Sequence, residues 1–145
     1  MGVQLIFVVE ANKSCKSDWI YIKSTIDYFY EYNRTGLKLS PVYMDGKGKY
    51  KQKEKEVKSL ISQYSKVSKG NKSKVIYCLD CDECDSKSED LTFLKTVKKY
   101  CDDRGYDFIW FCKDVEQVYI GKRVDKRQKK NESTKFKKNN LITKV

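Results

Sequence analysis

The feature that most constrains this chain is an apolar run that ends abruptly in carboxylates, over residues 75–85 (V-I-Y-C-L-D-C-D-E-C-D). The first five residues, Val75–Leu79, are typical of a buried strand. In an open parallel α/β sheet, ligands bind in the crevice outside the carboxyl ends of the strands. Asp80 and Asp82 follow this strand, and residues two apart in an extended segment can turn to the same side. We therefore predict a divalent cation site here, because hard cations prefer carboxylate oxygens.

Three other segments have the apolar, β-branched composition of strands, and they are residues 2–10, 37–44 and 106–112. The first is apolar almost throughout, which indicates a strand buried on both faces, and it ends in Glu10. Pro41 cannot donate a hydrogen bond to a neighbouring strand, so we expect residues 37–44 at a sheet edge or a strand start.

Apolar residues recur at helical spacing between these strands. The expected helices cover about 17–32, 57–67, a segment after Ser86 that ends at Arg104-Gly105, and a short segment after Asp114. The expected N-terminal caps are Ser14 or Ser17, Ser86 with Glu89, and Asp114 with Gln117. Residues 45–49 are expected to form a flexible loop. The alternation predicts a three-layer α/β/α sandwich around a four-stranded, mainly parallel sheet.

The chain changes character after residue 121. Residues 122–145 hold ten basic and two acidic residues and few apolar ones. We expect an α/β domain over 1–121, followed by a basic C-terminal arm. Such an arm is partly disordered alone and can settle on a phosphate backbone or against the domain.

Charge limits the chemistry that the chain can perform. The formal net charge is +11 and there is no histidine. Acid/base chemistry therefore falls to Asp, Glu, Lys, Tyr, Cys or metal-bound water. The basic excess predicts a polyanionic partner, DNA or RNA rather than a membrane, because clustered cations release counterions from phosphates. An ordinary solubilising surface is the competing explanation.

Six cysteines are compatible with disulfides, but the sequence has no N-terminal signal pattern and no apolar run of membrane-spanning length. We therefore expect a cytoplasmic protein with reduced thiols. Cys78, Cys101 and Cys112 lie in apolar stretches and are expected to be small core residues.

A thiol-bound metal is a second interpretation of the same region. Cys78, Cys81 and Cys84 have the C-x2-C-x2-C spacing that zinc and iron–sulfur sites use. A fourth ligand would have to come from Cys15 or Cys112.

A glutamate at the end of the first strand and a D-x-D at the end of the third resemble the Toprim domain. This domain is the metal-binding catalytic unit shared by topoisomerases, primases and the nucleases of the OLD and RloB-like phage-defence groups. Val8-Val9-Glu10 matches the glutamate motif, and Leu79-Asp80-Cys81-Asp82-Glu83 matches the D-x-D motif. The resemblance spans about residues 1–121. The chain departs from the family at Ala11, where the family usually has glycine.

The resemblance implies that Asp80 and Asp82 bind Mg²⁺ or Mn²⁺ and that Glu10 is a further ligand or an acid/base. A hard cation would stabilise the charge that develops during phosphodiester cleavage and would activate water. The resemblance also implies an additional acid after the fourth strand. For that role we favour Glu116, because Asp114 has the competing role of helix cap.

We therefore expect a metal-dependent nuclease or a related phosphoryl-transfer protein acting on DNA or RNA. Lys13 or Lys87 could stabilise its transition state. A non-catalytic nucleic-acid-binding module is the main alternative, and Ala11 is the argument for it. All of these expectations require the first and third strands to be neighbours.

Overall fold

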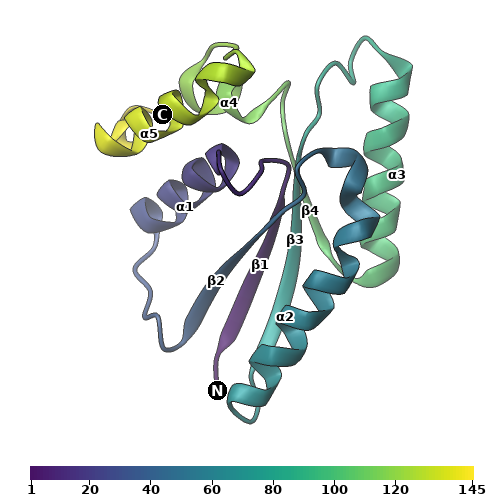
Figure 1. Ribbon diagram of the computed structural model, residues 1–145, viewed down its shortest axis with the longest axis vertical. Coiled ribbons are helices and arrows are strands. Elements are labelled where there is room, and N and C mark those ends of the chain that lie inside the picture. The colour runs from purple at the N-terminus through teal and green to yellow at the C-terminus, as the bar shows by residue number, and fades with distance from the viewer.

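Four apolar segments pair side by side as parallel strands in the computed structural model, which describes residues 1–145 (Figure 1). They are β1 (Val3–Val9), β2 (Leu37–Tyr43), β3 (Lys72–Asp80) and β4 (Asp107–Phe111). Their order across the sheet is β2-β1-β3-β4. The predicted α/β fold with a parallel sheet is therefore confirmed, and so is the edge position of β2. The first and third strands are neighbours, as expected, with Val9 opposite Cys78.

Five helices cover the two faces of this sheet. They are α1 (Ser17–Phe29), α2 (Glu54–Val67), α3 (Ser88–Arg104), α4 (Val115–Ile120) and α5 (Lys129–Lys138). Figure 1 shows α2 and α3 on one side of the sheet and α1 on the other, with α4 and α5 beyond α1. The three-layer arrangement is confirmed. No helix has the length and apolar character needed to cross a bilayer.

Alternating side chains of the central strands build two cores, because successive residues of a strand point to opposite faces. Ile6 and Val8 of β1 are fully buried among residues of α2 and α3. Phe7 and Val9 pack on the other face against Ile22 of α1. The expectation that β1 is buried on both faces is thus confirmed.

The connections make the region between β1 and β3 a topological switch point. The chain passes from β1 through α1 to β2 on one side of β1, and then through α2 to β3 on the other side. Loops that leave the carboxyl ends of β1 and β3 therefore diverge to opposite faces. Such a divergence leaves a crevice, which is the usual ligand position in open α/β sheets.

Two of the three expected helix caps are wrong. Lys16 precedes α1 and Lys87 precedes α3, and neither side chain bonds to its helix. The serines are used locally instead, since the Ser14 hydroxyl donates to Asn12 Oδ1 at 2.7 Å and the Ser86 hydroxyl to the Glu83 carbonyl at 3.4 Å. The cap at Asp114 is confirmed: its Oδ1 accepts the Gln117 N–H at 2.8 Å.

Two further expectations are corrected. Residues 45–49 are not simply a loop, because a 3-10 helix, η1 (Lys47–Lys53), begins within them and is anchored by the buried Tyr50. Cys112 is exposed, because it directly follows the short edge strand β4. Cys78 and Cys101 are buried as expected.

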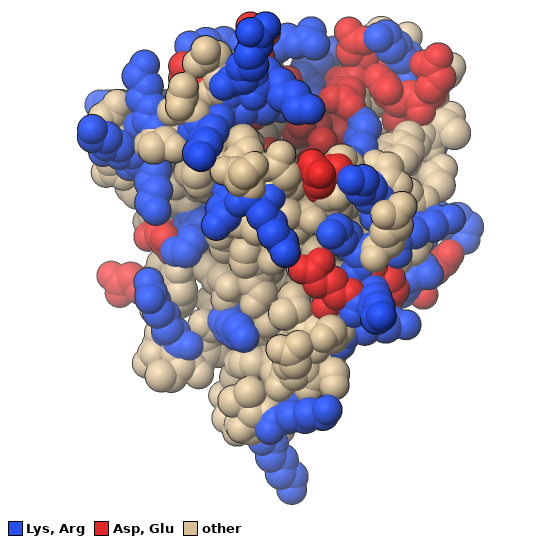
Figure 2. Space-filling view, in the orientation of Figure 1, with Lys and Arg blue, Asp and Glu red and all other residues tan.

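The basic C-terminal segment packs against the domain. It forms η2 (Lys126–Gln128), α5 and η3 (Leu141–Lys144), and α5 contacts α1. Phe136 is 1% exposed and packs edge-on against Tyr21 of α1, with ring centroids 5.0 Å apart. Figure 2 shows Lys and Arg side chains gathered over the region of α4 and α5, and acidic side chains near the start of α3.

Candidate functional site

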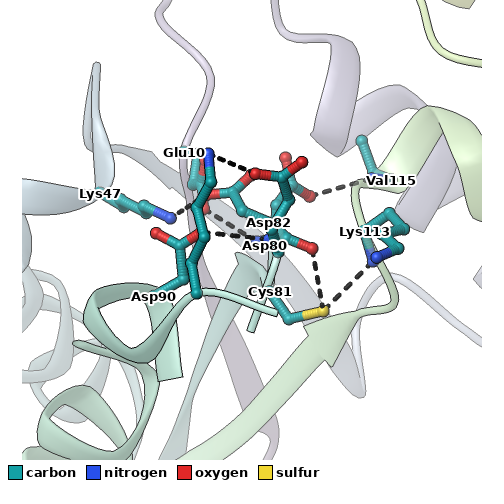
Figure 3. A network of polar contacts seen from close by, with 10 residues as sticks. Glu10, Lys47, Asp80, Cys81, Asp82, Asp90, Lys113 and Val115 are labelled. Carbon is teal, nitrogen blue, oxygen red and sulfur yellow. Dashed lines mark hydrogen bonds and ion pairs between the residues drawn. The ribbon is translucent and has the colours of Figure 1, made fainter. Parts of the chain in front are cut away.

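Glu10 and Asp80 meet at the switch point. Asp80 is the last residue of β3, and Glu10 directly follows β1. Glu10 Oε1 accepts the backbone N–H of Asp80 at 2.8 Å (Figure 3). The pairing of β1 with β3 thus brings together two predicted site residues that are far apart in the sequence.

Two neighbouring helices extend this contact into a chain of side-chain to backbone hydrogen bonds. Asp18, in the first turn of α1, accepts the N–H of Ala11 at 3.0 Å. Asp80 accepts the N–H of Val115, the first residue of α4, at 2.9 Å. One oxygen of each carboxylate therefore bonds to the backbone of another segment. This bond fixes the position of that segment and the rotamer of the acidic side chain.

Glu116, the second residue of α4, is the fourth carboxylate in this region. We call Glu10, Asp18, Asp80 and Glu116 the acidic cluster. Glu116 is 1% exposed, and neither of its carboxylate oxygens accepts a hydrogen bond. Its nearest cation is Lys129 of α5, with Nζ 3.7 Å from Oε2. A buried carboxylate without a hydrogen-bond donor is costly, and structures normally avoid it unless the group has a function.

The carboxylates of this cluster raise one another's pKa. Burial raises the pKa of Glu10 to about 7, and the charges of Asp18 and Asp82 add to the rise against the opposing effects of the Asp80 N–H and Lys47. The pKa of Asp80 rises to about 9, first through burial and then through the charge of Glu10. Asp18 and Glu116 also act on Asp80 in this direction, and their own pKa values are raised by burial.

Lys129 is the cation closest to these acids. Burial lowers its pKa, but the neighbouring carboxylates, Glu116 first and then Asp80, outweigh burial and raise the pKa above its ordinary value. Glu116, Asp80 and Asp18 thus share Lys129, whereas Lys47 acts on Glu10 from η1. The cluster has more carboxylates than cations.

A cavity of about 370 Å³ opens onto the acids from the α1 side. Its lining combines acidic side chains from α1, from the end of β3 and from the loops after β1 and β2 with two lysines from the C-terminal segment. The charged lining residues are Glu10, Asp18, Asp45, Asp80, Lys126 and Lys129. A phosphate group in this cavity would lie beside both the carboxylates and the ammonium groups.

Asp82 faces a different cavity from Asp80. Its backbone is left-handed (φ 51°) and its N–H donates to the Lys113 carbonyl at 2.7 Å, which turns the chain. Its carboxylate forms an ion pair with Lys47. It lines a polar cavity of about 700 Å³ with Lys87 and Arg123, among other residues. The structure therefore brings Asp82 near Glu10 and Lys47, but not into one cavity with Asp80.

No group of three or more acidic or cysteine side chains is already arranged around a common ion position. The hydrogen bonds of these acids explain why their side chains do not all point to one position. Glu10, Asp18 and Asp80 each direct one oxygen to a backbone N–H. Their remaining oxygens are the groups from which an ion could be coordinated.

The other site residues predicted from the sequence differ in their distance from this cluster. Asp114 caps α4 and lines the larger cavity, whereas Glu116 is buried among the acids. Lys87 pairs with Glu83 beside the larger cavity, and Lys13 is exposed and lines neither cavity. Sequence reasoning missed Asp18, Lys126 and Lys129, which lie in a helix and an arm rather than at a strand end.

The cysteines do not form a thiol cluster. All six are free, and Cys78 is buried in the core. Cys81 Sγ accepts the N–H of Lys113 at 3.2 Å, so this thiol holds the end of β4 against the D-x-D loop. Its role in the structure is that of a loop contact.

Comparison of the chain with family models, with curated proteins and with solved structures gives no match. The resemblance to the Toprim domain therefore depends on the residues themselves. The departure at Ala11 is compatible with the backbone, because Ala11 does not adopt the positive φ that would require glycine.

Proposed function

We propose that this protein is a divalent-metal-dependent phosphodiesterase that acts on DNA or RNA. The observation that supports it is the convergence of Glu10, Asp18 and Asp80 at the switch point, in a cavity with two lysines, one of which pairs with the buried Glu116. This composition matches a reaction in which anionic phosphate must be held next to carboxylates. The resemblance to the Toprim domain supports the same function.

The donor set fits Mg²⁺ or Mn²⁺. Glu10, Asp18 and Asp80 each direct one oxygen to a backbone N–H and have a second oxygen for an ion, and the acids that line the cavity outnumber its lysines. Glu10, Asp80 and Asp18 would hold the ion, with Asp82 next to Glu10. Such an ion would stabilise charge on the phosphate and lower the pKa of a bound water.

The protein's own groups have separate roles in this proposal. Lys126 would bind a non-bridging phosphate oxygen from the cavity wall. Lys129 would keep Glu116 ionised and positioned. Glu10, hydrogen-bonded to the Asp80 N–H, would either coordinate the ion or transfer a proton at its second oxygen. Glu10, Lys126 and Lys129 line the cavity in which the scissile phosphate would lie, whereas Glu116 is buried outside its lining.

The test is cleavage of labelled single-stranded and duplex DNA and RNA with Mg²⁺, Mn²⁺ or EDTA. We expect cleavage in divalent metal that falls by at least about 100-fold in Asp80→Asn. Asp107→Asn is the matched control, because Asp107 is exposed at the start of β4 and outside the cluster. Equal cleavage by the Asp80→Asn and Asp107→Asn variants would exclude this site.

A non-catalytic nucleic-acid-binding module is the second candidate. It is favoured by the absence of a ready-made arrangement of three ligands. It predicts salt-dependent binding without turnover in any divalent metal. We also propose a cytoplasmic location, because the six cysteines are free thiols and nucleic acid is the expected partner.

A further inference from the structure

The C-terminal segment has a free basic surface that leads to the acidic cluster. Of the ten basic residues in 122–145, only Lys129 forms an ion pair with an acid. We define the arm face as three exposed residues of this segment, Lys126, Arg127 and Lys130. No carboxylate neutralises these side chains, so their charge is available to a partner.

The arm face is held in place by packing rather than being a loose tail. Phe136 and Ile142 are buried in a cluster with Tyr21 of α1 and Val115 of α4. Ser133, on the same side of α5, is fully buried. Because these contacts fix α5 and the turn before it, the arm face has a defined position relative to the acids.

The same segment reaches both cavities. Lys126 lines the smaller cavity with Glu10 and Asp80. Arg123 lines the larger cavity with Asp82. Cations of the C-terminal segment therefore line both cavities beside the D-x-D loop.

On the opposite side of the site acids are concentrated, and the lysines there, Lys47, Lys87 and Lys113, are already paired with acids. Asp82, Glu83 and Asp90 line the larger cavity at the start of α3, and Asp85 lies on the loop before it. Figure 2 shows blue side chains gathered over α4 and α5, and a concentration of red with some blue among it near the start of α3. A phosphate backbone would thus approach from the α5 side.

We propose that the arm face binds the phosphate backbone of a nucleic acid and leads it to the cavity of Glu10 and Asp80. This inference rests on the proposed function, because it names the surface that delivers the substrate to that site. Each phosphate that the arm face neutralises releases counterions, so this surface sets the salt dependence of binding.

A second lysine-rich stretch provides the matched control. Residues 47–74 also hold ten basic and two acidic residues. Lys66, Lys69 and Lys72 of this stretch are exposed at the junction of α2 and β3, where strand β3 begins and not where it ends. In Figure 1 this junction lies at the end of the molecule opposite to α5.

The test compares the triple variants Lys126→Gln/Arg127→Gln/Lys130→Gln and Lys66→Gln/Lys69→Gln/Lys72→Gln. Binding of labelled DNA and RNA oligonucleotides is measured without divalent metal between about 50 and 200 mM salt. We expect the arm-face variant to lose at least about tenfold in affinity at the lower salt and to reduce the salt slope by about 2–3. The control variant should keep the wild-type slope. Circular dichroism confirms that both variants are folded.

The outcomes separate the two proposals. Equal weakening by both variants, or unchanged binding by the arm-face variant, would overturn the arm face as the binding surface while leaving nucleic-acid binding intact. If the wild-type protein itself binds neither DNA nor RNA, both the arm face and the proposed function are refuted.

Discussion

Asp80 is buried where three other carboxylates converge, and this position has an energetic cost. Its raised pKa means that the ionised form is disfavoured in the folded protein. The hydrogen bond from Val115 supports the carboxylate but does not neutralise it. A bound cation would remove the cost, and this links the stability of the cluster to its proposed use.

The pH dependence of stability follows from these raised pKa values. In the unfolded chain carboxylates lose their protons near pH 4, whereas Glu10 and Asp80 keep theirs to about 7 and about 9 when folded. The folded state therefore binds more protons between these values, and its stability falls as pH rises. At about 1.4 kcal/mol per pKa unit the two shifts set an upper limit of about 8 kcal/mol, and we expect the free energy of unfolding to fall by at least about 2 kcal/mol between about pH 5 and pH 9 in EDTA. Denaturant unfolding measures it.

The Asp80→Asn variant tests the assignment of this pH dependence. It should retain less than about half of the wild-type decline, because one of the two groups can no longer ionise. Asp107→Asn should decline like the wild type. A wild-type stability that rises with pH over this range would show that the acids are not buried together.

Individual site residues differ in how far the sequence could predict them. Glu10 and Asp80 could be predicted because both end an apolar strand, and parallel strands end at the same edge. Asp18 could not, since an acid in the first turn of a helix is common and stabilises the helix dipole. The separation of Asp82 from Asp80 depends on one left-handed residue, which the sequence does not indicate.

Helix α5 begins with Lys129, and the short helix η2 directly before it carries Lys126, so these two elements bring both lysines to the site. The buried side chains of α5 are only Ser133 and Phe136, so its sequence has no helical apolar periodicity. The strands and the helices α1 to α3 were predicted because their apolar residues repeat along several turns or a whole strand. The serine caps were wrong because hydroxyls also bond within tight turns, as Ser14 does with Asn12.

Removing the anchor of α5 should therefore affect both stability and function. We expect Phe136→Ala to lower the free energy of unfolding by about 3–5 kcal/mol, because Phe136 fills a space between Tyr21 and Tyr119. Hydrogen exchange should show α5 losing protection before the sheet does. Phe29→Ala is the control, because Phe29 is 65% exposed and should change stability by less than about 0.5 kcal/mol. Undiminished protection of α5 in Phe136→Ala would contradict this role.

At the scale of the whole molecule, the arrangement of charge matters more than its total. The sequence contains two stretches with the same excess of basic residues, 47–74 and 122–145. Only the fold distinguishes them, since the second packs on α1 beside the acids while the first continues to the far end of α2. The net charge of +11 predicts a polyanionic partner but not the face to which it binds.

The order of the strands in the sheet determines where the site lies. Because β1 and β3 are neighbours whose following loops diverge, four carboxylates from distant segments share one region of the molecule. The proposed function requires this region to bind a divalent cation.

Anomalous diffraction from crystals soaked in Mn²⁺ locates such a cation. We expect a manganese peak in the smaller cavity, within coordination distance of Glu10 and Asp80 oxygens. A protein that binds no manganese there, or binds it only at acids outside this cluster, would refute the proposed metal site.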